Sequence, residues 1–148
     1  ALFELGLGII FLVYSWGLLP LDQVILITAG LTLGIYDFRH QEYPLLVWMT
    51  FHLLLMACSG WNLVMIFFLV LGIMAHFIDI RMGAGDFLFL ASCALVFSVT
   101  ELLILIQFAS ATGILAFLLQ KKKERLPFVP FLLLAATIII FYQFLLVC

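Results

Sequence analysis

Long apolar runs separated by short polar breaks organise this chain. The runs lie near 4–19, 22–36, 45–59, 61–78, 86–99, 101–119 and 126–147. A bilayer crossing takes about 20 apolar residues, about 17 at the lower end, and shorter segments occur in packed bundles. The pattern therefore predicts an all-α membrane protein, a polytopic bundle of about seven transmembrane helices, several of them short.

Composition supports the membrane class. Of the 148 residues, 68% are hydrophobic and 9% are charged, whereas soluble domains are about 45–50% apolar and about 25% charged. No polar stretch is long enough to form a separate soluble domain, so we expect residues 1–148 to form a single transmembrane domain in contact with the lipid bilayer. No basic stripe with interleaved aromatic residues is present, so nucleic-acid binding has no support.

The basic residues orient the predicted bundle. If the runs cross the membrane alternately, all 6 Lys and Arg residues share one side: Arg39, Arg81, Lys121, Lys122, Lys123 and Arg125. The positive-inside rule makes that side cytoplasmic. The amino end would then lie inside and the carboxyl end outside.

Two aspartates stand at the ends of apolar runs on this predicted cytoplasmic side. Asp37 closes the second run, and Asp86 opens the fifth directly after the turn that contains Gly83 and Gly85. Ionisable groups at membrane depth are costly and usually functional. Two carboxyl groups in close contact share a proton, so that one can act as a base on water and the other as an acid toward a carbonyl. We therefore predict a water-activating pair.

Glycines near both aspartates suggest close packing. Gly83 and Gly85 would allow positive φ values and a close approach to a ligand or a neighbouring helix. Gly30 and Gly34, four residues apart in the second run, would let another helix come near Asp37. The alternative is a plain solvated loop in which Asp86 is only the N-cap of the next helix.

Four segments in chain order resemble elements of the type IV prepilin peptidases. They are Glu4–Leu5, Asp37–Pro44 with its Asp-x5-Tyr-Pro pattern, Met82–Asp86 with Gly-x-Gly-Asp, and Leu126–Pro130 with Pro-Phe-x-Pro. Leu45 stands where many members have Asn, and Leu88 where many have Lys. These variants are similar to the competence pseudopilin peptidases of Gram-positive bacteria.

The resemblance implies a membrane-embedded aspartic endopeptidase of the GxGD type, a hydrolase. Such an enzyme removes the basic leader from type IV prepilin or pseudopilin precursors at the cytoplasmic face of the bacterial cytoplasmic membrane, in pilus assembly, competence or protein secretion. Asp37 and Asp86 match the catalytic aspartates, and Gly83 and Gly85 match the supporting turn, with no metal or organic cofactor. Candidate contacts with the substrate or the pair are Tyr36, Arg39, Glu42, Pro44, Pro127, Phe128 and Pro130.

Full-length bifunctional members of the family carry an amino-terminal segment, often with paired CxxC motifs, that is linked to methylation. We expect no methyltransferase activity from the residues shown. Cys58, Cys93 and Cys148 lack metal-site spacing and are expected to be buried thiols. His52 and His76 lie within the runs, and we expect each to bond to a neighbouring carbonyl or hydroxyl. Of the two, His76 is the better candidate to approach the active region.

Two other interpretations stay open. A presenilin-like or signal-peptide-peptidase-like protease also carries Tyr-Asp and Gly-x-Gly-Asp, but its Pro-Ala-Leu element is absent from the last run. A small proton-coupled transporter or scaffold subunit would use the aspartates as a proton relay. Transporters often show internal repeats, and none is visible in this chain.

Overall fold

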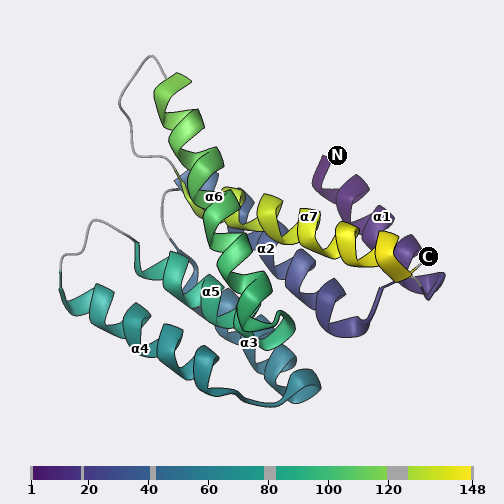
Figure 1. Cartoon of the computed structure of the whole chain (residues 1–148), viewed down its shortest axis with the longest axis horizontal. Coiled ribbons are helices and arrows are strands. Elements are labelled where there is room, and N and C mark those ends of the chain that lie inside the picture. The colour runs from purple at the N-terminus through teal and green to yellow at the C-terminus, as the bar shows by residue number, and fades with distance from the viewer. Residues whose placement is uncertain (1, 18, 41–42, 79–82, 120–126, 148) are drawn as a thin grey trace.

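The computed structural model describes residues 2–17, 19–40, 43–78, 83–119 and 127–147, and this part of the chain is helical with no strand. Each expected run corresponds to one helix (Figure 1). The helices are α1 (Leu2–Ser15), α2 (Leu21–His40), α3 (Leu45–Ser59), α4 (Leu63–Phe77), α5 (Ala84–Val96), α6 (Val99–Leu119) and α7 (Val129–Val147). The predicted all-α class and the positions of the helices are confirmed.

Three of the described helices, α2, α6 and α7, are long and apolar enough to cross a membrane. The other four have 13 to 15 residues. At about 1.5 Å per residue these are about 20–23 Å long, less than the roughly 30 Å of a hydrocarbon core. Helix length therefore supports a membrane protein with three candidate spans.

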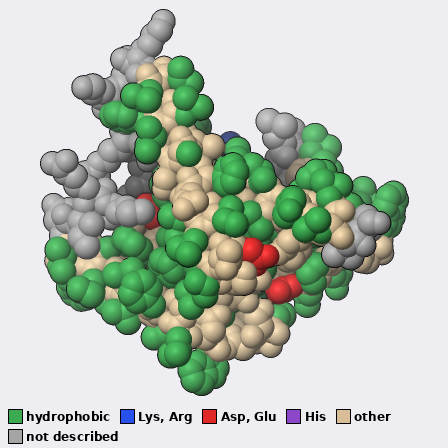
Figure 2. All heavy atoms as spheres, in the orientation of Figure 1, with side chains coloured by type: hydrophobic (Ala, Val, Ile, Leu, Met, Phe, Trp, Pro, Cys, Tyr) green, Lys and Arg blue, Asp and Glu red, His purple; other side chains and the backbone are tan. Residues whose placement is uncertain are grey.

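The surface agrees with this class. Figure 2 shows a face covered mostly by hydrophobic side chains. Large apolar residues such as Leu46, Leu63 and Phe77 are about four-fifths exposed, at 80%, 78% and 82%. Many large exposed apolar side chains are typical of a surface in contact with a membrane or a partner.

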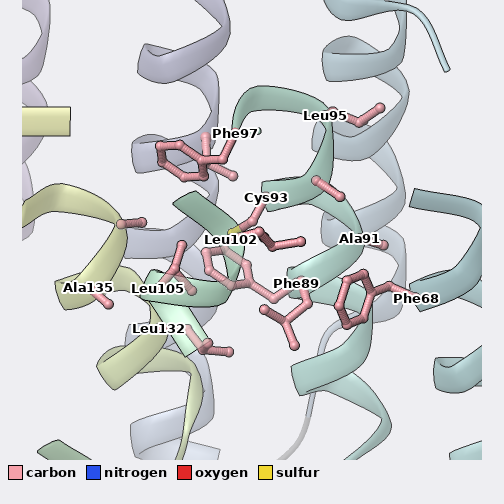
Figure 3. Packing of buried hydrophobic residues seen from close by; sticks show 14 of the residues in the cluster. Phe68, Phe89, Ala91, Cys93, Leu95, Phe97, Leu102, Leu105, Leu132 and Ala135 are labelled. Carbon is pink, nitrogen blue, oxygen red and sulfur yellow. The ribbon is translucent and has the colours of Figure 1, made fainter. Parts of the chain in front are cut away.

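Helix α5 is the centre of the bundle. Every residue from 88 to 95 is buried, and α5 packs against α2, α3, α4, α6 and α7. Figure 3 shows Phe89 and Cys93 of this helix among the leucines of α6 and α7. Asp86 lies in the first turn of this helix, just before the buried run, and is itself buried.

Helices α2 and α7 lie antiparallel and close together. A Cβ added to Gly34 would lie 3.9 Å from the Cα of Pro130, and one added to Gly30 would lie 3.1 Å from Cζ of Phe89. The expected close approach of a neighbouring helix at these glycines is therefore confirmed. Because Gly34 lies one turn before Asp37, the approach brings the start of α7 beside that aspartate.

Candidate functional site

The first carboxylate is held by the first turn of α5. Gly83 is the N-cap of the helix, and its carbonyl accepts a hydrogen bond from the backbone N–H of Asp86 at 3.1 Å. The Asp86 carboxylate in turn accepts a hydrogen bond from the backbone of Gly83. This arrangement is half of a capping box, and the Asp86 side chain is only 8% exposed. Asp86 is thus a buried residue inside the helix, and the alternative in which it is a solvated N-cap is wrong.

The second carboxylate lies near the end of α2 and is half-buried. Asp37 accepts a hydrogen bond from the backbone N–H of Val129, the first residue of α7. The free N–H groups and the dipole at a helix start favour a negative group. The start of α7 therefore holds the Asp37 carboxylate in place.

The fold brings the two aspartates together from separate helices. The charge of Asp37 acts on the carboxyl group of Asp86, so the two groups lie within electrostatic range of each other. Each is held by the backbone at the start of a helix, Asp86 by Gly83 and Asp37 by Val129.

The ring of Tyr43 leaves no room for a side chain at Gly85. A Cβ added to Gly85 would lie 2.6 Å from Cγ of Tyr43 and 3.0 Å from its Cβ, so the Tyr43 ring packs directly on the backbone of the α5 first turn. The predicted close approach at this glycine is confirmed, whereas the positive φ that glycine allows is not adopted in this turn. Gly83 has φ −65° and Gly85 lies inside the helix, and in the described residues positive φ occurs at Gly17 and Gly60.

Tyr43 is the residue of this site that sequence reasoning missed. Its hydroxyl oxygen is buried and has no hydrogen-bond partner among the described residues. Burial, with smaller contributions from Cys93, Asp86 and Asp37, raises the pKa of the phenol above its usual value, so the hydroxyl keeps its proton. The available signal was its place directly before Pro44 in the Asp37–Pro44 segment.

The start of α7 supports the site through packing. A Cβ added to Gly113 of α6 would lie 3.3 Å from Cε2 of Phe128, and Pro130 faces Gly34 of α2. Pro127 is half-buried. The Pro-Phe-x-Pro segment thus fixes where the N–H of Val129 points.

The remaining candidate contacts within the described residues lie at the ends of helices, and two of them are exposed. Pro44 is the N-cap of α3. Tyr36 is 39% exposed and Arg39 is exposed. Glu42 lies outside the described residues, as do the predicted basic residues of the later breaks: Arg81, Lys121, Lys122, Lys123 and Arg125.

His52 and His76 each contact a residue outside the Asp37–Asp86 pair. His52 shares a 2.9 Å hydrogen bond with the hydroxyl of Ser92, as expected, and Trp48 donates to Ser92 at 3.0 Å and to the carbonyl of Leu88 at 2.9 Å. His76 is exposed and its ring contacts Phe77. We therefore assign the Trp48–Ser92–His52 group to the packing of α3 on α5.

All three cysteines were expected to be buried, and the structure confirms this for one of them. Cys93 is buried, whereas Cys58 is exposed, so its predicted burial is wrong; it lies near the end of α3, where that helix offers no inward face. Cys148 lies outside the described residues. Among the described residues no three His, Cys, Asp or Glu side chains gather to hold a metal ion.

In comparisons with known proteins, no family model, no curated protein and no solved structure matches this chain.

Proposed function

We propose that this chain is a membrane-embedded aspartic endopeptidase of the prepilin peptidase type. The observation that carries the proposal is the meeting of Asp37 and Asp86 within electrostatic range at one end of an apolar helical bundle. Ionisable groups are placed in such surroundings at a cost in stability, which function can explain. The ordered resemblance of four sequence segments supplies the reaction class.

The proposed reaction is hydrolysis of one peptide bond. One carboxylate takes a proton from a water molecule while the water oxygen bonds to the carbonyl carbon, and the other carboxyl group gives its proton to the carbonyl oxygen. The resulting tetrahedral diol collapses: the C–N bond breaks, the nitrogen takes the proton held by the first aspartate, and one diol hydroxyl returns its proton to the second. The products are a carboxylic acid and an amine, and both aspartates regain their starting state.

The proposed substrate has a basic leader followed by a hydrophobic helix, as in type IV prepilins and pseudopilins. A hydrophobic substrate helix can reach the site through the bilayer because the bundle exposes apolar side chains. A basic leader suits a site with two acidic groups. The Leu45 and Leu88 variants favour competence pseudopilins as the precursor.

The proposed membrane placement puts the site at the cytoplasmic face of the bacterial cytoplasmic membrane. All seven helices would lie in the bilayer, with the four short ones packed around the three candidate spans. The clustering of basic residues in the sequence supports this orientation.

The test is cleavage of precursor peptides by the purified chain in detergent or liposomes. Peptides with a basic leader, a Gly before the cleavage point and a hydrophobic helix should release the leader, as seen by mass spectrometry. Asp37→Asn and Asp86→Asn should each lower the rate by about 10³-fold or more, because each removes a proton carrier from the reaction.

Asp22→Asn is the matched control because Asp22 lies in the first turn of the same helix that carries Asp37 near its other end. It should cleave within about twofold of the unmodified chain, since it removes no group that handles protons in the reaction. Cleavage that persists in both aspartate variants would overturn the proposal. Proton-coupled uptake into liposomes that both variants abolish, without any cleavage, would favour a transporter.

A further inference from the structure

The hydroxyl of Tyr43 is a polar group that the two-aspartate reaction leaves without a role. It is buried and has no hydrogen-bond partner among the described residues. Leaving a buried donor unsatisfied lowers the stability of the fold, and such groups in native proteins call for an explanation. A Phe at this position would keep the ring and avoid that cost.

The ring of Tyr43 is held firmly against the aspartate turn. It packs on the backbone of Gly85, where any side chain would collide with it. Pro44 follows directly and restricts the backbone of Tyr43 to extended conformations. The phenol is therefore a fixed feature of the site rather than a side chain free to turn away.

The Tyr43 ring lies on the backbone of Gly85, the residue directly before Asp86. Both Asp86 and Asp37 lie within electrostatic range of the phenol, as does the buried thiol of Cys93. A protonated phenol takes no proton from the reaction, and it offers a hydrogen-bond donor beside a pair of groups that serve as base and acid. During the reaction the carbonyl oxygen on the scissile carbon gains electron density, and this makes it a stronger hydrogen-bond acceptor.

We propose that Tyr43 is a third catalytic residue, whose hydroxyl donates a hydrogen bond to the oxygen of the scissile carbonyl as that carbon becomes tetrahedral. This inference rests on the proposed peptidase function. The phenol keeps its proton throughout, so the proton balance between water and the two aspartates is unchanged. The hydrogen bond forms more strongly in the tetrahedral state than with the bound substrate, which is the condition for raising kcat.

The test is Tyr43→Phe, which retains the ring on Gly85 and removes the hydroxyl. We expect kcat to fall about 10- to 100-fold, which is no more than the usual loss in kcat when one hydrogen-bond donor to the reacting oxygen is removed. KM should stay within about threefold. A leader peptide with a hydroxyethylene group in place of the scissile bond mimics the tetrahedral state, and its affinity should fall by a similar factor. The affinity of an uncleavable peptide with a methylated scissile nitrogen should not change.

The control variant is Tyr142→Phe, because Tyr142 is 61% exposed near the far end of α7. It should behave as the unmodified chain does in every assay. The melting temperature of Tyr43→Phe should be equal to or above that of the unmodified chain, since the variant removes an unpaired buried hydroxyl.

The outcomes separate the two proposals. Failure of the unmodified chain to cleave any precursor overturns the peptidase function and this inference with it. Normal cleavage by the unmodified chain together with an unchanged kcat in Tyr43→Phe overturns the role of Tyr43 alone. A lower kcat accompanied by lower melting temperature and equal weakening of both peptides would show that the hydroxyl serves packing, and would also overturn it.

Discussion

The antiparallel helices α2 and α7 carry polar residues at both ends. The two ends differ in how many of these polar groups have a hydrogen-bond partner. At one end, Gln23 near the start of α2 donates to Gln143 near the end of α7 at 3.0 Å. Gln143 donates to Glu101 of α6 at 2.6 Å. Ser98 donates to the other oxygen of Glu101 through its backbone N–H and its hydroxyl, both at 2.8 Å.

The opposite end has the same two helices but a different polar arrangement. Asp37 takes one backbone hydrogen bond from Val129, lies within range of a second carboxyl group on Asp86, and has the unpaired hydroxyl of Tyr43 nearby. Two carboxyl groups lie within electrostatic range of each other, and one hydroxyl donor has no hydrogen-bond partner among the described residues.

The difference suggests how to distinguish polar groups that stabilise an apolar bundle from polar groups that bind a ligand or take part in a reaction. A chain of hydrogen bonds in which each member has a partner adds stability in surroundings of low dielectric constant. A site that crowds carboxyl groups and leaves a donor unpaired loses stability, so its retention suggests a ligand or a reaction. By this criterion the Gln23–Gln143–Glu101 end is a structural clamp, and the Asp37–Asp86 end is the candidate site for the proposed reaction.

The largest expected effect among backbone positions is at Gly85. Gly85→Ala places a methyl group where the Tyr43 ring lies, so the ring must leave the aspartate turn. We expect kcat/KM for precursor cleavage to fall about 100-fold, comparable to losing a positioned catalytic group. Steady-state kinetics on the purified variant measures this. Unchanged kinetics would mean that the ring contact does not shape the site.

At the clamp, the expected effect is on stability. Gln143→Leu removes the link between Gln23 and Glu101 and leaves the charged Glu101 with fewer partners. We expect a loss of about 1–3 kcal/mol in the free energy of unfolding, seen as a lower melting temperature in detergent. Cleavage per folded molecule should stay within about twofold. A large loss of kcat at an equal folded fraction would break the distinction between the two ends.

The smallest effect is expected at Gly83, two residues from Gly85 in the same turn. A Cβ at Gly83 would lie 3.4 Å from Oδ2 of Asp86, an ordinary contact, and φ of −65° is open to any residue. Gly83→Ala should therefore cleave at no less than about a third of the normal rate. Paired rate measurements on the two glycine variants compare them directly, and an equal loss in both would contradict the specific role of Gly85.

Much of the fold was predictable from hydropathy alone. The seven apolar runs each contain a helix, because the need to bury or shield long apolar segments is local to each segment. The predicted boundaries failed mainly where helices are shorter than their runs: the run near 86–99 becomes a helix that ends at Val96. Hydropathy shows which residues are apolar but not where a helix ends. Here the helix ends before the apolar run does.

The candidate site was predictable in part. That Asp37 and Asp86 end apolar runs was visible in the sequence, and alternation of the runs allowed them to share one end of the bundle. Burial of Asp86 inside the helix was not visible, because an Asp after glycines fits an N-cap equally well. The reason for Gly85 was hidden as well, since the residue that demands it lies in another segment.

The amino-acid order by itself determined the membrane class, the helical segments and the placement of acidic residues at segment ends, because each depends on composition within one stretch of chain. Only the tertiary structure decided that Val129 holds Asp37, that Tyr43 lies on Gly85, and that Gln143 joins Gln23 to Glu101. These contacts join residues on different segments. They depend on how closely whole helices pack, which no single stretch of sequence specifies.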